Sequence, residues 1–145
     1  WLGNLDRRSF SMSNEGGRIV VSAGTKENSS VYVASVIRDP QGNPIGFGSP
    51  IKPAGQVSAQ SVTWLDNIRV GVLSDSVESY AQPLVVMVGG GTRSLTSIRG
   101  GQTMVGSGQA ASVFILDSGQ AMYQFRGSNW VLVATNVYAL RFPGN

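Results

Sequence analysis

Residues able to do chemistry are sparse in this chain, which has neither cysteine nor histidine among its 145 residues. The missing histidine removes the commonest general base near neutral pH and every Ser-His-Asp arrangement. The missing cysteine removes thiolate chemistry, the usual zinc sites and any disulfide. We therefore expect a protein that is not an enzyme and that uses no metal or cofactor.

Three short motifs resemble catalytic or nucleotide-binding signatures, but each lies in unsuitable surroundings. Residues 106–111 (GSGQAA) match the dinucleotide fingerprint G-x-G-x-x-A, yet a strand pattern follows where the fingerprint needs a helix. Residues 89–93 (GGGTR) could form an anion-binding nest, but no Gly-Lys-Ser/Thr follows. Residues 49–52 (SPIK) spell S-x-x-K, whose chemistry needs a helix that the flanking prolines prevent. We interpret all three as turns or loops.

Carboxylates and aromatic rings leave open an alternative, a carbohydrate-binding or glycan-processing β-domain. Four acidic residues could form a glycosidase pair, namely Asp66, Asp75, Glu78 and Asp117. Three aromatic residues could stack on sugars, namely Trp64, Tyr123 and Trp130. In a repeat fold we expect these carboxylates to lie in separate turns, where Asp serves local hydrogen bonds, and the aromatic residues to lie in the core.

Arginines supply the only excess charge. The formal net charge is +3, and residues 79–145 supply all of it, with four arginines against one aspartate. Four arginines over that length form no nucleic-acid-binding stripe, so we expect no nucleic-acid partner. Arginine is favoured at interface hot spots. The candidate partner-binding residues are therefore Arg93, Arg99 and Arg126.

The residues that must position these groups are organised around positions 61–74 (SVTWLDNIRVGVLS), which predict a β-hairpin. Two strand-like halves meet at the turn of residues 65–67, and the second half alternates with a period of two. A helix is the rival interpretation, because several apolar residues also lie at helical spacings. Gly71 and the β-branched residues disfavour the helix.

Similar hairpins recur on both sides, which predicts a repeat. The apolar anchors of the second strands, Ile19, Val70 and Val113, are 51 and 43 positions apart, and propeller blades repeat at about 40 to 50 residues. We expect a single β-propeller fragment over residues 1–145. Its blade-like units span approximately residues 5–53, 57–98 and 101–135, with an extra strand at 137–142.

The composition and the inner strands favour an all-β propeller. Only 13 % of the residues are charged, and 19 are glycine, which fits a chain rich in strands and turns. Residues 83–88 (PLVVMV) and 112–116 (SVFIL) are apolar on both faces, as expected for antiparallel sheets stacked between neighbours. The sequence thus predicts part of a β-propeller with about three four-stranded antiparallel blades, and a β-sandwich remains the alternative. Three blades do not close a ring of four to eight, so we also expect self-association through the open faces or a sandwich-like collapse.

No run approaches the roughly 18 apolar residues needed to span a bilayer. The chain opens with Trp1 rather than with an initiator Met or a signal peptide, so we expect it to be a piece of a larger protein.

With these motifs in place, the chain resembles the C-terminal β-propeller of the LpqB-type lipoproteins of actinobacteria. The likeness runs over nearly the whole chain and depends on the order of four individually loose motifs. They are residues 11–21 (SMSNEGGRIVV), 31–42 (VYVASVIRDPQG), 62–73 (VTWLDNIRVGVL) and 116–145, the last with a DSG turn, Tyr123, Gly127, Trp130 and a closing FPG. The first motif departs from the family, which usually has an Asp before a single Gly.

The resemblance implies a function that the residues alone do not. Members of the family are lipid-anchored outside the cytoplasmic membrane and are associated with the Mtr two-component sensor kinase and with envelope and division processes. The implied role is a non-catalytic, protein-binding portion of an envelope lipoprotein, whose partner is the extracytoplasmic domain of a sensor histidine kinase. The membrane would be reached only through a lipid anchor outside this chain. The family has no catalytic motif, so no site residue is carried over.

Overall fold

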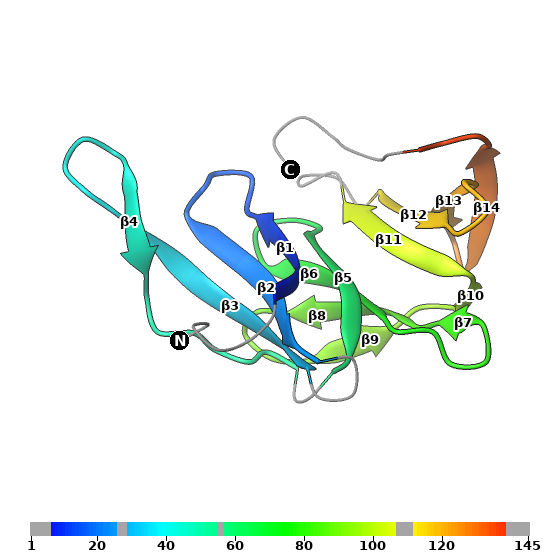
Figure 1. Cartoon of the computed structure of the whole chain (residues 1–145), viewed down its shortest axis with the longest axis horizontal. Helices are drawn as coiled ribbons and strands as arrows, with labels where there is room; N and C mark the ends of the chain where they lie inside the picture. The colour runs from blue at the N-terminus through cyan, green and yellow to red at the C-terminus, as the bar shows by residue number, and fades with distance from the viewer. Residues whose placement is uncertain (1–6, 26–28, 55–56, 107–111, 139–145) are drawn as a thin grey trace.

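The computed structural model of the chain describes residues 7–25, 29–54, 57–106 and 112–138 and is built of β-strands (Figure 1). The strands are β1 (Arg7–Met12), β2 (Arg18–Gly24), β3 (Ser29–Arg38), β4 (Pro44–Phe47), β5 (Ala59–Trp64), β6 (Arg69–Ser74), β7 (Tyr80–Ala81), β8 (Pro83–Met87), β9 (Thr92–Ser94), β10 (Ile98–Arg99), β11 (Gly101–Gly106), β12 (Val113–Asp117), β13 (Met122–Arg126) and β14 (Asn129–Ala134). Within these ranges, no helix has the length and apolar character needed to cross a membrane.

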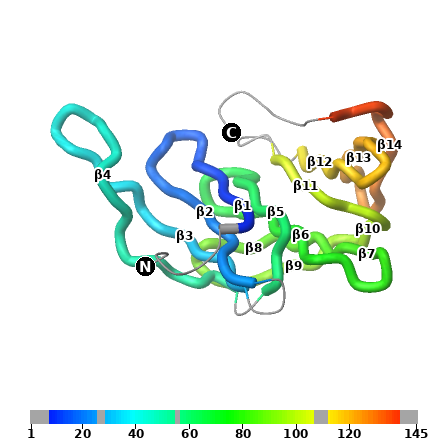
Figure 2. The backbone as a smooth tube through the Cα atoms, in the orientation of Figure 1, coloured from blue at the N-terminus to red at the C-terminus, as the bar shows by residue number. Residues whose placement is uncertain are grey.

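The strands form three four-stranded antiparallel sheets that follow one another along the chain (Figure 2). The first sheet has the order β1-β2-β3-β4, the second β5-β6-β8-β9 and the third β11-β12-β13-β14. This arrangement confirms the expected all-β fold with about three four-stranded units. The short strands β7 and β10 form a separate two-stranded pair beside the second sheet, which the sequence did not predict because two residues carry no period.

The hairpin predicted over residues 61–74 is confirmed, and the helical alternative is wrong. Strands β5 and β6 pair antiparallel, with Trp64 opposite Val70. Asp66 fixes the turn between them, because its Oδ1 accepts the N–H groups of Ile68 at 3.0 Å and Arg69 at 2.8 Å. An aspartate that hydrogen-bonds its own turn is a common hairpin device.

The sheets are arranged as propeller blades rather than as a two-layer sandwich. Their first strands lie together, with β5 contacting both β1 and β11. The second sheet is therefore covered on both faces. Val70 and Val72 lie in one core cluster with Val20 and Val31 of the first sheet, and Leu73 lies in another cluster with residues of the third sheet. Burial on both faces explains why its strands are apolar without alternation.

The end of the chain departs from the simple repeat. The extra strand expected over residues 137–142 lies outside the described residues from position 139 onward. Val137 and Tyr138 are not in a strand, and the Val137 N–H donates to the Gln120 carbonyl at 2.8 Å. The motif at residues 106–111 also lies outside the described residues, apart from Gly106 at the end of β11.

Candidate binding cleft between the second and third sheets

An open cleft of about 610 Å³ lies where the second sheet meets the third. Its lining is mostly polar and includes Gln60, Ser79, Arg99, Gln102, Ser118 and Tyr123. These residues come from β5, the loop after β6, the adjoining strands β10 and β11, and the β12–β13 hairpin. Rigid strands that present loops around a shared cleft are a common way to build a binding site.

Backbone hydrogen bonds hold the rim of this cleft. The Gly100 N–H donates to the Ser79 carbonyl at 2.8 Å, and the Ser118 N–H donates to the Gly100 carbonyl at 2.9 Å. Gly100 has a φ of +70°, which an L-residue rarely adopts, and an added Cβ would lie 3.1 Å from the Ser118 hydroxyl. The three loops are thus joined in series, so the rim is fixed before a ligand arrives.

The loop after β6 stores backbone strain at the rim. Glu78 and Ser79 both have positive φ, at 51° and 72°, although neither is glycine. Non-glycine residues in this region carry a conformational cost and persist where the surroundings hold them. Here the Gly100 N–H holds the Ser79 carbonyl. Such strain often accompanies a functional loop.

Asp117 shapes the other rim of the cleft instead of offering a free carboxylate. Its Oδ1 accepts the N–H groups of Gly119 and Ala121, each at 2.9 Å. These bonds fix the β12–β13 turn and so place Ser118 beside the cleft. This is the local hydrogen-bonding role expected for an aspartate in a turn.

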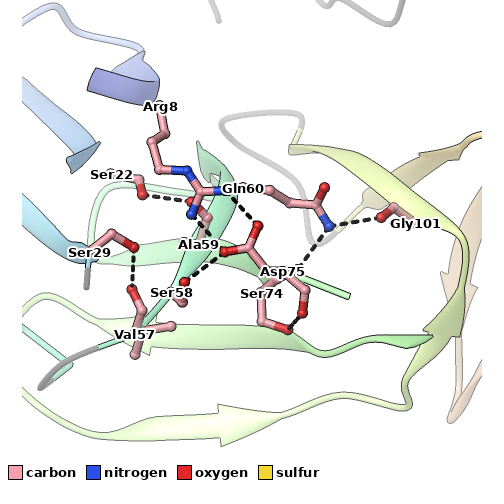
Figure 3. Close-up of polar contacts among 10 residues, drawn as sticks. All are labelled: Arg8, Ser22, Ser29, Val57, Ser58, Ala59, Gln60, Ser74, Asp75 and Gly101. Atoms are coloured by element: carbon pink, nitrogen blue, oxygen red, sulfur yellow. Dashed lines mark hydrogen bonds and ion pairs between the residues drawn. The ribbon is translucent and has the colours of Figure 1, made fainter. Parts of the chain in front are cut away.

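Gln60 joins the two sheets beside the cleft (Figure 3). Its amide Nε2 donates to the Ser74 carbonyl at 2.8 Å and to the Gly101 carbonyl at 2.9 Å. It can reach both carbonyls because it lies in a β-bulge, where the β5–β6 register shifts between Ala59 and Ser61.

A charged brace occupies the corresponding place between the first and second sheets (Figure 3). Arg8 of β1 makes a bidentate ion pair with Asp75, with donor–acceptor distances of 2.6 and 2.5 Å. The Ser58 hydroxyl donates to the same carboxylate at 2.7 Å. The side chains of Arg8 and Asp75 are only 20 % and 14 % exposed, so the pair is shielded from solvent. Paired planar groups in this geometry are among the stronger ion pairs.

The three arginines proposed from the sequence do not form one patch. Arg99 lines the cleft described above, whereas Arg93 lines a smaller groove of about 210 Å³ with Leu65, Val85 and Phe125. Arg126 lies on the face of β13 turned away from the second sheet and donates to Gln124 Oε1 at 2.9 Å. All three are exposed. Of the three, Arg99 alone lines the larger cleft.

Two of the aromatic residues proposed as sugar-stacking groups make structural contacts. Trp64 is 1 % exposed, its Nε1 donates to the Ser11 carbonyl at 3.0 Å, and the Arg18 guanidinium lies 4.8 Å from the ring centroid. Trp130 is half-buried, and its Nε1 donates to the Thr96 carbonyl at 2.7 Å. Tyr123 packs against the same core cluster as Trp130 and, in addition, lines the cleft.

Three of the four acidic residues proposed as a glycosidase pair have separate structural partners, and the fourth, Glu78, is exposed in the loop after β6. Asp75 pairs with Arg8, and Asp117 holds its own turn. Partial burial is the largest influence on Asp66 and raises its pKa, but hydrogen bonds from Arg69 and Ile68 outweigh burial and lower the pKa below its ordinary value. A carboxyl group with a lowered pKa is a poor general acid. The described ranges contain no cluster of three or more His, Cys, Asp or Glu residues that could hold a metal ion.

The sequence contains a signal for this site other than the three arginines. Each first strand contains a long polar residue, a hydroxyl residue and an apolar residue in succession. The three triplets are Arg8-Ser9-Phe10, Gln60-Ser61-Val62 and Gln102-Thr103-Met104. The first residue of each triplet lies in a β-bulge, and Gln60 and Gln102 both line the cleft. Aligning the three repeats would have singled out these positions.

The repeat architecture now has a counterpart among known proteins. A family model described as "Lipoprotein LpqB beta-propeller domain" matches residues 6–141. A search of curated proteins finds no match. The matched range covers all three sheets and the cleft between the second and the third, and so the chain belongs to the LpqB lipoprotein β-propeller family.

Proposed function

We propose that this propeller portion is a non-catalytic protein-binding module of a cell-envelope lipoprotein. Its partner would be the extracytoplasmic domain of a sensor histidine kinase, whose signalling it modulates in envelope and division processes. The family supports the envelope setting, and the cleft between the second and third sheets supports the binding role. The parent protein would be held outside the cytoplasmic membrane by a lipid anchor.

The observation that carries this proposal is the preorganised rim of the cleft. Ser79, Gly100 and Ser118 are joined by two backbone hydrogen bonds, and Arg99 offers a guanidinium beside them. Guanidinium and hydroxyl groups recognise carboxylates, so the cleft suits an acidic loop of the partner. A rigid site binds with a smaller ordering cost than a mobile one.

The proposal is tested by measuring the affinity of the chain for the kinase domain by calorimetry. Arg99→Glu replaces attraction by repulsion, so we expect a loss of affinity of at least about tenfold. The matched control is Arg126→Glu, which makes the same charge change on a different face and should alter the affinity less than about threefold. Unchanged binding by Arg99→Glu would reject the cleft as the docking site. Unchanged binding with charge reversal at Arg93, Arg99 and Arg126 together would reject an arginine-based site altogether.

Tyr123 favours carbohydrate binding as a second candidate function. Its ring lines a cleft that also contains hydroxyl and amide groups, and sugars are often held by an aromatic face with polar groups around it. Soluble envelope glycans titrated into the chain would bind the parent and lose affinity with Tyr123→Ala. Equal binding by both chains, or binding by neither, would reject this candidate.

A further inference from the structure

The connection between β6 and β7 ends in a hairpin that projects from the molecule beside β10 (Figure 1). The Val77 N–H donates to the Tyr80 carbonyl at 2.8 Å, and the Tyr80 N–H donates to the Val77 carbonyl at 3.0 Å. The two residues between them, Glu78 and Ser79, both have positive φ. This geometry is a type I′ turn, in which Asn and Gly are the favoured residues. We call residues 76–80 the β6–β7 tip.

The β6–β7 tip keeps this strained turn while it exposes two large apolar side chains. Val77 is 73 % exposed and Tyr80 is 49 % exposed. The two side chains lie next to each other, because the residues are directly opposite in an antiparallel pair. The turn therefore carries a conformational cost that burial of these side chains does not offset. Strain of this kind gathers at binding and catalytic sites.

The base of the hairpin is well held, so the exposed pair is presented on a rigid support. The Ser74 N–H donates to the Gln82 carbonyl at 3.0 Å, and the Gln82 N–H donates to the Ser74 hydroxyl at 2.8 Å. Ala81 pairs with Ile98 of β10, and both residues are buried in the core cluster between the second and third sheets. A rigid surface loses less conformational entropy on binding than a mobile one.

The β6–β7 tip borders the polar cleft, but its apolar pair lies outside the cleft lining. Ser76 and Ser79 line the cleft with Arg99, whereas Val77 and Tyr80 do not. Tyr80 is nevertheless next to Arg99, because the two residues pair across β7 and β10. Arg99 makes no salt bridge with another residue of the described ranges, so its charge is available to a partner.

We propose that Val77 and Tyr80 are the apolar anchor of the same protein interface that uses the cleft. The inference rests on the proposed function and states what the partner must offer, namely an apolar pocket beside an acidic loop that reaches Arg99. A small sugar would fill the cleft without covering the pair, whereas a protein surface covers both. Tyrosine and arginine are enriched at interface hot spots, where neighbouring contacts exclude water.

The proposal is tested by calorimetry of the chain with the extracytoplasmic domain of the sensor kinase. Tyr80→Ala should raise the dissociation constant about thirtyfold, and Val77→Ser about fivefold. The matched controls are Phe10→Ala and Ile45→Ser on the first sheet, which are 67 % and 66 % exposed in the parent and should change the constant less than about twofold. All four side chains are exposed, so none of these variants should lower the midpoint of urea denaturation by more than the others.

The outcomes separate this inference from the proposed function. A parent chain that does not bind the kinase domain would reject both. If the parent binds and Arg99→Glu weakens binding, but Tyr80→Ala and Val77→Ser do no more than their controls, the inference alone is overturned. If the tip variants weaken binding and Arg99→Glu does not, the pair acts without the cleft and the joint interface is overturned. Weaker binding by Arg99→Glu and by both tip variants supports the proposal.

A fluorescent label shows directly whether the β6–β7 tip is covered in the complex, since the chain has no cysteine of its own. Val77→Cys carrying an environment-sensitive dye should give a blue-shifted and stronger emission when the kinase domain is added. Ile45→Cys with the same dye is the control and should give no change. A dye at position 77 that responds no more than the dye at position 45, in a complex that calorimetry shows to form, would overturn the proposal.

Discussion

The two junctions between sheets are built on one backbone plan but are completed by different side chains. In each, a serine hydroxyl of one first strand accepts an N–H of the next, and a bulge residue reaches across. At the first junction the bulge residue is Arg8, which pairs with Asp75. At the second it is Gln60, and Ser118 takes the place equivalent to Asp75. The Arg8–Asp75 ion pair therefore closes the first junction, whereas the second junction has an open polar cleft.

The opposite ends of the two junctions also differ. At the first, the Trp64 indole fills the space and donates to the first sheet. The equivalent position at the second junction is Gly106, where an added Cβ would lie 2.5 Å from the Trp64 carbonyl oxygen. The second pair of sheets is thus in close backbone contact at one end and separated at the other. We infer that one repeat can serve as a brace or as a binding site, depending on two or three side chains.

The largest expected loss of stability comes from the substitution Gly106→Ala, which breaks the close backbone contact at the second junction. The new methyl group would meet a carbonyl oxygen at 2.5 Å and the Leu65 Cδ2 at 2.7 Å, so the first strands must separate. We expect a loss of about 3 kcal/mol in the free energy of unfolding, measured by urea denaturation.

The control for this change is Gly89→Ala, where no atom lies within 4 Å of the added Cβ. It should change the stability by less than about 0.5 kcal/mol. If Gly106→Ala reduced the free energy of unfolding no more than this control, close backbone contact would not be a feature that distinguishes the second junction from the first.

The next largest loss of stability is expected when the side chains of the first junction are replaced by those found at the second. Arg8→Gln leaves the mostly buried Asp75 carboxylate without its guanidinium, and we expect a loss of about 2 kcal/mol. The double variant Arg8→Gln with Asp75→Ser reproduces the residues of the second junction and should recover about half of that loss. Urea denaturation measures both, and Arg126→Gln serves as the exposed-arginine control. A double variant that is no more stable than Arg8→Gln alone would contradict a paired brace.

The fold followed from the sequence because its signals are local. The alternation in residues 61–74, the aspartate turn and the repeated apolar anchors each specify a strand or a hairpin within about ten residues. The cleft did not follow, because its rim joins Ser79, Gly100 and Ser118, which only tertiary packing brings together. For the same reason, the sequence could not show that Arg93, Arg99 and Arg126 lie at different places on the surface. Their shared charge says nothing about which face of a sheet each one occupies.

A smaller, pH-dependent loss of stability is expected from a change at the turn end of the first junction. Its turn end is held by Asp66, whose partner Arg69 lies on the same hairpin, and by Arg18, which donates to the Asn67 carbonyl and lies over the Trp64 ring. Hydrogen bonds lower the pKa of Asp66 in spite of its partial burial. Its ionised form therefore stabilises the folded state above the unfolded pKa, and this contribution is lost as the pH falls through the lower, folded pKa.

Asp66→Asn should accordingly cost about 1 kcal/mol at pH 7, since the pair is partly exposed. The gap between parent and variant should narrow as the pH falls below about 4, because the parent loses the same interaction on protonation. Urea denaturation at pH 7, 4 and 3 measures the gap. A gap that stays constant over this range would show that the charge of Asp66 does not stabilise the turn.

The smallest expected effect comes from building the brace into the second junction with Gln60→Arg and Ser118→Asp. Gln60→Arg removes the two hydrogen bonds that the Gln60 amide donates to the Ser74 and Gly101 carbonyls. We expect each single variant to lose about 1 kcal/mol in the free energy of unfolding. The double variant should regain about 0.5 to 1 kcal/mol through the new ion pair, so its stability exceeds the sum of the singles. The guanidinium would also cross the cleft, and ligand binding that depends on Arg99 should weaken. Strict additivity in a double-mutant cycle would mean that no ion pair forms across the second junction, and that these two side chains alone do not account for the brace at the first.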